Sequence, residues 1–268
     1  MTASILLAGA GRMGGALLKG WIERGIRPLL VLEPHPSLSL RRLATSGSIS
    51  LHKNPEEVSA RLRAVVIALK PQVLRSEAEK FRRIAQSGAL MISIAAGTTI
   101  RSLKHAWGRD ARIVRAMPNT PGAIGRGISA LYAPANINAA DRMLAQTLLA
   151  ALGETLWVER ESLIDSVTAV SGSGPAYVFL FVEALAEAAR GEGLSKSAAD
   201  RLARATIAGA GALLDADQRA AAELRKDVSS PGGTTEAALR VLAASDGLKP
   251  LIVRAVRAAR KRAEELGR

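Results

Sequence analysis

The first residues that could do chemistry form a glycine-rich turn. Gly9-Ala10-Gly11-Arg12-Met13-Gly14 has GxGxxG spacing, follows the apolar run Ile5–Ala8 and precedes a helical pattern over Gly15–Arg24. The first glycine allows a tight turn, the second lets a diphosphate approach the backbone, and the third lets the helix pack closely on the strand. Amides at the helix start then face the anion. The turn therefore predicts a dinucleotide site at Gly9, Gly11, Arg12, Met13 and Gly14, with a ligand-free turn as the alternative.

An acidic residue follows at the distance that dinucleotide sites use. Glu33 stands nineteen residues after Gly14, at the end of the apolar run Pro28–Leu32. A carboxylate there accepts hydrogen bonds from a ribose 2′-hydroxyl, which favours NAD. The following residues include donors that could instead hold the 2′-phosphate of NADP, namely His35, Ser37, Arg41 and Arg42. The choice between NADP(H) and NAD(H) stays open, and Glu33 and His35 as solvated loop residues are the simpler alternative.

Hydroxyls and glycines gather again in the segment Ser229-Ser230-Pro231-Gly232-Gly233-Thr234-Thr235, which opens a helical pattern. Exposed amides at a helix start, beside the Ser230 and Thr235 hydroxyls, suit a carboxylate ligand. The alternative is an ordinary Ser or Thr N-cap, in which Pro231 takes the first helical position and the hydroxyls satisfy backbone donors.

The sequence offers few residues for metal binding or for nucleophilic and acid–base catalysis. The chain has no cysteine, and its three histidines, at positions 35, 52 and 105, are not spaced as metal ligands or as an acid–base pair. We therefore expect neither a catalytic metal site nor a Ser-His-Asp arrangement. The net charge of +13 is spread along the chain and only 3% of residues are aromatic, which disfavours nucleic acid and favours small anionic metabolites as partners.

A sheet in the first part of the chain would position these segments. Short apolar runs alternate with helical patterns up to about residue 158, which is typical of an α/β fold with a parallel, doubly wound, Rossmann-like sheet. The expected strands are Ile5–Ala8, Pro28–Leu32, Ile49–His52, Ala64–Leu69, Ala89–Ala95, Arg112–Met117, Ile128–Tyr132 and Thr155–Val158. Ligands of such folds bind at the carboxyl ends of the strands.

After residue 158 the chain becomes alanine-rich and helix-favouring, so we predict domains at 1–158 and 159–268, the second all α. Expected helix breaks are Gly172–Pro175, Gly191–Leu194, Asp215–Gln218 and Pro231–Gly233. Within the helical part, Leu202, Thr206, Gly209 and Leu213 share one helical stripe. This stripe favours a homodimer interface, with packing inside the chain as the alternative.

Several segments together resemble one enzyme family. They are Ala68-Leu69-Lys70-Pro71, Ser93–Gly97, Arg115–Pro121, Val170-Ser171-Gly172-Ser173-Gly174-Pro175-Ala176-Tyr177 and Asp227–Thr235. In this order, across both domains, they are similar to pyrroline-5-carboxylate reductases. GxGxxG occurs in many dehydrogenases, whereas the SGSGPAY and SPGGTT segments are far more specific to this family.

The resemblance implies roles for individual residues. It places Asn54, Ala68, Leu69, Lys70, Pro71, Ile94, Ala95 and Ala96 beside the dinucleotide. It implies that Thr235 hydrogen-bonds near the ring nitrogen of the substrate and is the catalytic residue. It also implies that Ser230 and Thr234, with the amides of Gly232 and Gly233, hold the substrate carboxylate, and that Glu161 contacts the product.

The implied activity is hydride transfer from NAD(P)H to 1-pyrroline-5-carboxylate, giving L-proline. The expected protein is a cytoplasmic homodimer, or a higher oligomer of dimers, that binds neither nucleic acid nor membrane. The longest apolar candidate, Tyr177–Leu185, contains Glu183 and falls short of the roughly twenty residues that span a bilayer. The alternatives are another two-domain dehydrogenase with Lys196 or Lys226 as its catalytic residue, and a non-catalytic dinucleotide sensor.

Overall fold

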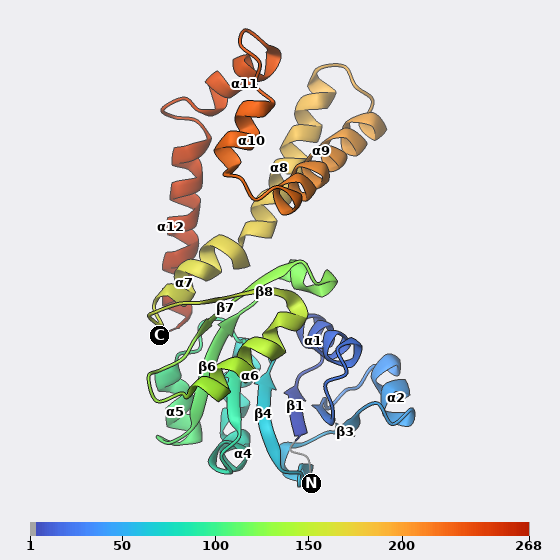
Figure 1. The fold of residues 1–268 in the computed structure, drawn as a ribbon, viewed down its shortest axis with the longest axis vertical. Helices are drawn as coiled ribbons and strands as arrows, with labels where there is room; N and C mark the ends of the chain where they lie inside the picture. The colour runs from blue at the N-terminus through green and yellow to red at the C-terminus, as the bar shows by residue number, and fades with distance from the viewer. Residues whose placement is uncertain (1–3, 268) are drawn as a thin grey trace. The chain divides into compact units, whose positions relative to one another are not determined.

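Eight strands form a single sheet in the computed structural model, which describes residues 4–267. In chain order they are β1 (Ser4–Ala8), β2 (Leu29–Leu32), β3 (Ser50–His52), β4 (Leu62–Ile67), β5 (Leu90–Ser93), β6 (Arg112–Met117), β7 (Gly127–Tyr132) and β8 (Gly153–Trp157). Their order in the sheet is β3-β2-β1-β4-β5-β6-β7-β8, and every pair is parallel except β6–β7. All eight strand predictions are confirmed, and so is the doubly wound, Rossmann-like fold class (Figure 1).

Helices and short turns cover both faces of the sheet. They are α1 (Arg12–Glu23), α2 (Leu38–Thr45), η1 (Pro55–Glu57), α3 (Pro71–Glu77), η2 (Ala78–Phe81), α4 (Arg82–Gln86), α5 (Ile100–Trp107), η3 (Thr120–Ile124), α6 (Ala139–Leu149), η4 (Ala150–Leu152), α7 (Leu163–Val167) and η5 (Thr168–Gly172). Residues of β1 alternate between the faces, as the twofold period of a strand requires. Leu7 packs in the same cluster as Trp21 of α1, whereas Leu6 packs with Trp107 of α5.

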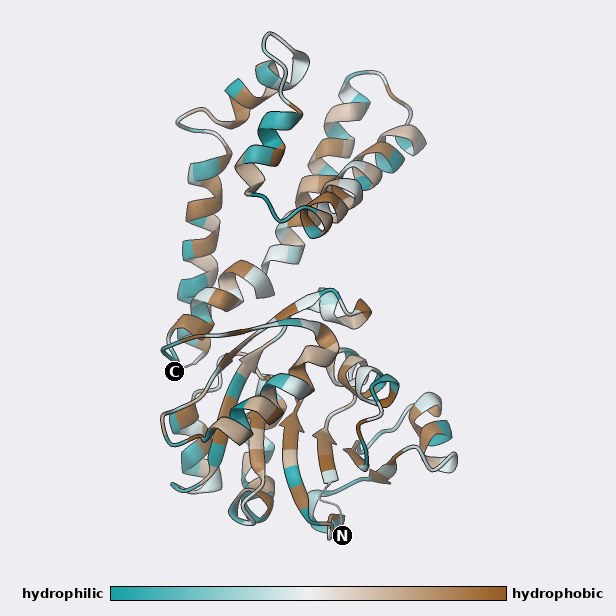
Figure 2. Ribbon diagram, in the orientation of Figure 1, coloured by the Kyte–Doolittle hydropathy of each residue, from teal (hydrophilic) through white to brown (hydrophobic). Residues whose placement is uncertain are grey.

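The central strands are buried on both faces, which explains why they are continuous apolar runs in the sequence. Every residue of β1, β2 and β5 is buried. These strands are among the most hydrophobic segments in Figure 2. The sheet therefore forms a rigid base whose carboxyl edge can hold loops in fixed positions.

The rest of the chain is helical. Its helices are α8 (Gly174–Gly191), α9 (Lys196–Ala216), α10 (Ala221–Asp227), α11 (Thr234–Leu242) and α12 (Leu248–Leu266). The predicted breaks at Gly191–Leu194, Asp215–Gln218 and Pro231–Gly233 are confirmed. A further break between α11 and α12 was not predicted.

The predicted break at Gly172–Pro175 corresponds to Ser173, which separates the π-helical turn η5 from the start of α8. Pro175 has no amide to donate to the carbonyl of Ser171, four residues earlier. Asn119 replaces that donor, since its Nδ2 donates to the Ser171 carbonyl oxygen over 3.2 Å. The helical segment Leu163–Gly191 is thereby long and apolar enough to cross a membrane by length and composition, which alone is weak evidence of a membrane helix.

The chain packs as two compact units, one of residues 4–173 with 259–267 and the other of residues 174–258. This partition differs from the predicted division at residue 158 because α7 and the C-terminal end of α12 pack with the sheet. Gly97, with φ of 64°, leaves no room for a side chain, since a Cβ there would lie 2.9 Å from the carbonyl oxygen of Leu266. Arg75 also donates to that carbonyl over 3.3 Å.

Candidate functional site

The three glycines of the N-terminal turn have different environments. Gly9 has φ of 90°, and a Cβ at Gly9 would lie 3.0 Å from the carbonyl oxygen of Ala68. A Cβ on Gly14 would collide with the carbonyl oxygen of Gly9. Around Gly11, by contrast, nothing lies within 4 Å of the space that a Cβ would fill. Gly9 and Gly14 are therefore required by the fold, whereas Gly11 leaves the backbone open to a ligand.

The start of α1 is suited to an anion. Its N-cap is Gly11, which has no side chain that could cap the helix, and the first turn contains no acidic residue. The first amides of a helix have no partner within the helix and carry partial positive charge. An open backbone at Gly11 and an uncapped helix start fit the diphosphate of a dinucleotide.

The predicted cofactor segments lie on neighbouring strands. β1 lies between β2 and β4, and the chain reverses its direction across the sheet at this point, where α/β folds bind ligands. The Ala68 amide donates to the Ala8 carbonyl over 2.8 Å, and the Ile94 amide donates to the Ile67 carbonyl over 3.1 Å. The structure thus brings the glycine-rich turn, Ala68–Pro71 and Ile94–Ala96 to one edge.

Two other residues that were predicted to bind the cofactor lie at this edge, each as the N-cap of a helix. Lys70 is exposed at the N-cap of α3, directly before Pro71. Asn54 precedes η1, and its Nδ2 donates to Glu57 Oε1 over 3.1 Å. Hydrogen bonds from the amide of Lys53 and the side chain of Asn54 lower the pKa of the Glu57 carboxyl. One of the two amide hydrogens of the Asn54 side chain is therefore already used within the protein.

Glu33 is held against the glycine-rich turn. Its Oε2 accepts the amide of Ala10 over 3.0 Å, and its Oε1 accepts the amide of His35 over 3.3 Å. Glu33 is half-buried, whereas the His35 side chain is exposed. The acidic residue that the sequence singled out is therefore an ordered part of the turn.

Glu161 forms part of a charged cluster under α5. Its Oε1 lies 2.8 Å from Arg115 Nη1 and accepts the Ile100 amide over 2.7 Å. The Arg115 side chain is 4% exposed, so Glu161 supplies the negative charge that this cation needs. The predicted contact of Glu161 with product stays a prediction, and both of the contacts above are made by Oε1.

Within the helical unit, the segment Ser229–Thr235 joins α10 to α11. The N-cap of α11 is Gly233, so no side chain caps the helix, and Pro231 lies outside the helix. Among the described residues, the hydroxyls of Ser230, Thr234 and Thr235 make no hydrogen bond. The alternative of an ordinary hydroxyl N-cap does not match this arrangement. These three hydroxyls remain available to a ligand, whereas the Gly233 amide donates to the Ser230 carbonyl oxygen over 3.0 Å.

One amide of this loop already has a carboxylate partner. The Gly232 amide, at φ of 73°, donates to Glu236 Oε2 over 2.6 Å. Glu236 also lies 3.4 Å from Arg240. Glu236 was not expected from the sequence, although a glutamate in the first turn of a helix after two glycines is a detectable signal. Arg115 was expected only as part of the segment Arg115–Pro121, and its own signal is a cation inside an apolar strand.

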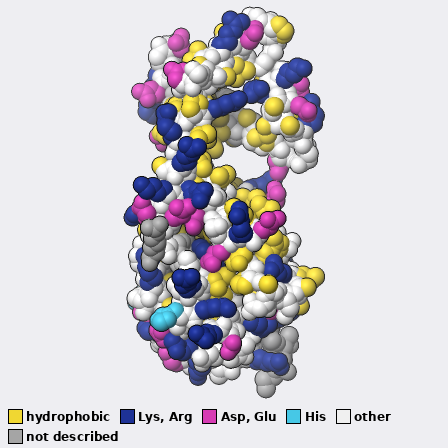
Figure 3. Space-filling model, turned by 90° about the vertical axis from the view of Figure 1, so that its left-hand side faces the viewer, with side chains coloured by type: hydrophobic (Ala, Val, Ile, Leu, Met, Phe, Trp, Pro, Cys, Tyr) yellow, Lys and Arg dark blue, Asp and Glu magenta, His cyan; other side chains and the backbone are white. Residues whose placement is uncertain are grey.

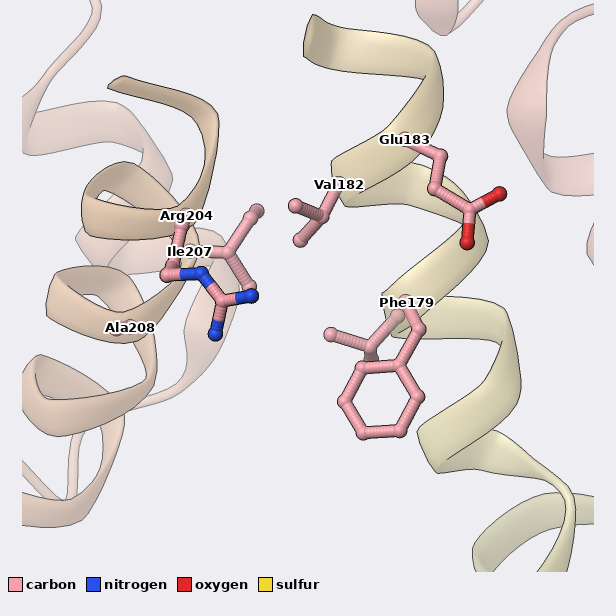
Figure 4. Close-up of a pocket in the computed structure, with 7 residues that line it drawn as sticks. Phe179, Val182, Glu183, Arg204, Ile207 and Ala208 are labelled. Atoms are coloured by element: carbon pink, nitrogen blue, oxygen red, sulfur yellow. The ribbon is translucent and has the colours of Figure 1, made fainter. Parts of the chain in front are cut away.

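A groove of about 520 Å³ lies between α8 and α9. Figure 4 shows Val182 and Ile207 pointing toward each other across it, and Phe179 turning its ring in from α8. Arg204 and Glu183 also line it, and no cluster of acid–base groups does. Within residues 4–267, no three His, Asp or Glu side chains gather as metal ligands.

Comparison with known proteins adds independent findings. The family model described as pyrroline-5-carboxylate reductase dimerisation matches residues 161–266, and that described as NADP oxidoreductase coenzyme F420-dependent matches residues 4–97. A curated pyrroline-5-carboxylate reductase of Pseudomonas aeruginosa is 38% identical over 99% of this chain and 97% of its own. The chain belongs to the pyrroline-5-carboxylate reductase family.

Solved structures of the pyrroline-5-carboxylate reductase family agree. That from Coxiella burnetii is 34% identical and superposes with a TM-score of 0.91 over all of both chains. That from Plasmodium falciparum, with NADP bound, is 28% identical, with a TM-score of 0.82, over 100% of this chain and 99% of its own. The chain is therefore an NAD(P)H-dependent oxidoreductase, and residues 161–266 are the dimerisation domain through which this family self-associates.

Proposed function

We propose that this protein transfers hydride from NAD(P)H to the C=N carbon of 1-pyrroline-5-carboxylate and releases L-proline. The observation that carries this proposal is the full-length match to pyrroline-5-carboxylate reductases, which covers the glycine-rich turn and the Ser229–Thr235 loop in one chain. The reduced nicotinamide supplies the hydride. The protein's own residues bind and orient the two reactants.

In this proposal the cofactor-binding residues are those at the carboxyl edge of the sheet. The amides of Gly11, Arg12, Met13 and Gly14 hold the diphosphate. Gly9 shapes the turn, because its own amide donates to the Leu32 carbonyl over 2.9 Å. The segments Ala68–Pro71 and Ile94–Ala96 line the rest of the dinucleotide site. Lys70 contributes positive charge at the start of α3, where its side chain is exposed. Asn54 and His35 lie at the ends of neighbouring strands.

The substrate-binding residues are those of the second loop. The Ser230 and Thr234 hydroxyls hold the carboxylate, because donors at an uncapped helix start favour an anion. The Gly232 and Gly233 amides join them when they exchange their present acceptors, Glu236 and the Ser230 carbonyl, for the substrate. The Thr235 hydroxyl hydrogen-bonds near the ring nitrogen. An imine that arrives protonated becomes an amine when hydride reaches its carbon, so the site needs positioning more than a strong acid.

The catalytic-lysine alternative has less support. Lys196 lies on the first turn of α9 and binds Asp200 over 2.7 Å, with its side chain 79% exposed. We further propose that the protein is cytoplasmic, that it forms a homodimer or a higher oligomer of dimers, and that it binds neither nucleic acid nor membrane. In Figure 3 the Lys and Arg side chains are scattered among acidic ones on the visible face, which suits small anionic ligands better than a polyanion track.

The test is the loss of absorbance of NADH or NADPH on mixing with pyrroline-5-carboxylate. The wild-type protein is expected to oxidise reduced cofactor only when the imine is present. Thr235→Ala should lower kcat/KM about a hundredfold, a loss of about 2.7 kcal/mol, and Thr235→Ser should restore most of it. The control Thr147→Ala removes a hydroxyl that bonds within α6 and should change nothing. A folded Thr235→Ala protein with wild-type kinetics would remove Thr235 from the mechanism.

A further inference from the structure

One backbone carbonyl at the end of α12 meets two segments of the sheet unit. The last residues of α12 pack with that unit (Figure 1). Arg75 Nη1 donates to the Leu266 carbonyl oxygen over 3.3 Å. The same oxygen lies 2.9 Å from the place that a Cβ would take on Gly97. The last carbonyls of a helix have no donor within the helix and carry partial negative charge, so the Arg75 guanidinium stabilises this end.

Both partners are attached directly to the loops that we propose for the cofactor. Gly97 follows Ala96, the last residue of the Ile94–Ala96 segment. Arg75 lies one turn after Pro71, the first residue of α3. The strands that precede these loops, β4 and β5, are neighbours in the sheet. A contact that reaches both loops therefore fixes the spacing between them.

The close approach at Gly97 requires a glycine. Its φ of 64° is in the left-handed region, and a Cβ there would lie 3.0 Å from the carbonyl carbon of Leu266. That carbon and its oxygen are backbone atoms, which cannot rotate away as a flexible side chain would. Gly267 extends the contact, since a Cβ on it would lie 3.7 Å from the Gly97 carbonyl oxygen. A larger residue at position 97 must therefore displace either the end of α12 or the loop.

We propose that Gly97 and Arg75 are positioning residues for cofactor binding. They seat the end of α12 against both loops and hold Lys70–Pro71 and Ile94–Ala96 at the separation that the dinucleotide requires. A site whose loops are already in place binds more tightly, because less order has to be created on binding. The inference deepens the proposed function and rests on the cofactor segments stated there. The contact includes no residue of the Ser229–Thr235 loop, so imine binding should not depend on it.

The test is a fluorescence titration of NADH and of NADPH, without imine, into wild-type and variant proteins. Gly97→Ala should raise the dissociation constant of the more tightly bound cofactor about tenfold, and Arg75→Met about threefold, because the loops lose their common support. Arg75→Lys keeps a donor and a positive charge and should restore most of the affinity. At saturating cofactor, kcat and KM for the imine should stay close to wild type, whereas a general loss of structure would lower kcat.

Two matched controls separate the contact from local strain and from loss of charge. Gly25→Ala places a Cβ at a φ of 69°, and nothing lies within 4 Å of that Cβ. Arg27→Met removes an exposed arginine that donates to the Ser48 carbonyl over 3.2 Å, at the amino ends of β2 and β3. Both controls should bind cofactor as wild type does.

An Arg75→Met protein with the same dissociation constant as Arg27→Met would overturn the proposal, and this variant changes only an exposed side chain, so it should fold. A folded Gly97→Ala protein that binds cofactor as tightly as Gly25→Ala would do the same. If cofactor binding weakens as expected but wild type does not reduce pyrroline-5-carboxylate, the proposed substrate is wrong and the positioning role stands. Unchanged cofactor binding in variants of an active enzyme refutes the positioning role alone.

Discussion

Glu236 shows how one side chain can oppose the ligand that its own loop is built to hold. Its carboxylate accepts the Gly232 amide, the same kind of contact that we propose for the substrate carboxylate. A resident carboxylate must leave that amide before another binds, which costs affinity. The loop is therefore folded before the substrate binds, but the Glu236 carboxylate already occupies one of its amide donors.

Glu236→Gln should consequently lower KM for pyrroline-5-carboxylate about threefold and leave kcat nearly unchanged, because a neutral amide competes less well for the Gly232 donor. Initial rates over a range of imine concentrations measure this. Glu223→Gln, in the first turn of α10, is a matched control. A raised KM in the Glu236 variant would mean that Glu236 orders the loop more than it competes.

Asp165 is the residue whose ionisation opposes folding. Burial raises its pKa, as do Glu264 and Glu161, while Arg115 and Arg260 act in the opposite direction. A raised folded-state pKa means that the folded protein holds the proton more tightly than the unfolded chain. The stability that this group contributes is present at low pH and is lost as pH rises from 3.8 through the folded pKa.

Asp165→Asn should therefore melt at a higher temperature than wild type at pH 7, and the gap should close toward pH 4. Melting curves from pH 3.5 to 8 test this. Asp200→Asn should show the opposite trend, weakly, because a hydrogen bond from Lys196 lowers the pKa of exposed Asp200. A pH-independent gap for Asp165→Asn would assign its effect to packing instead of charge.

At the scale of elements, Asn119 joins two segments that are distant in sequence. Its Nδ2 donates to Ser171 in η5, and its Oδ1 accepts the Ile128 amide of β7 over 3.0 Å. The first bond satisfies the carbonyl that Pro175 leaves without a partner, and the second holds the loop after β6. Asn119 therefore positions the start of the SGSGP segment against the sheet.

Asn119→Ala should lower the free energy of unfolding by about 2 kcal/mol, since two hydrogen bonds of about 1 kcal/mol each are lost. Urea denaturation measures the loss. Asn119→Asp keeps the acceptor for Ile128 but not the donor for Ser171, so it tests the two bonds separately. An unchanged denaturation midpoint for the alanine variant would show that water replaces both partners.

At the scale of the molecule, the helical unit has almost no core of its own. Its buried hydrophobic residues are the alanines at 186, 199 and 203, whereas 15 of the 22 exposed large hydrophobic side chains of the described residues lie between 174 and 258. Yellow side chains are exposed over these helices in Figure 3. Such a surface is stable in water when a second copy covers it. The match of residues 161–266 to the dimerisation family model indicates that this surface binds the second copy.

Leu213→Glu, on the predicted stripe of α9, should shift the protein to monomer or unfold it, because Leu213 is 63% exposed in the single chain. Analytical ultracentrifugation and the concentration dependence of the melting temperature measure this. Leu38→Glu, at a leucine that is 73% exposed in the sheet unit, is the matched control. A dimeric Leu213→Glu protein would place the interface on another face.

The sequence by itself determined the eight strands, the glycine-rich turn and the family, because apolar runs, glycine spacing and helix breakers are local signals. The tertiary structure decided the contacts between residues that are far apart in the sequence, which local signals do not specify. It showed that Asn119 supplies the donor that Pro175 lacks and that Glu161 pairs with buried Arg115. It also showed that Glu33 is fixed by the Ala10 amide, a contact between residues brought together by the pairing of β1 with β2.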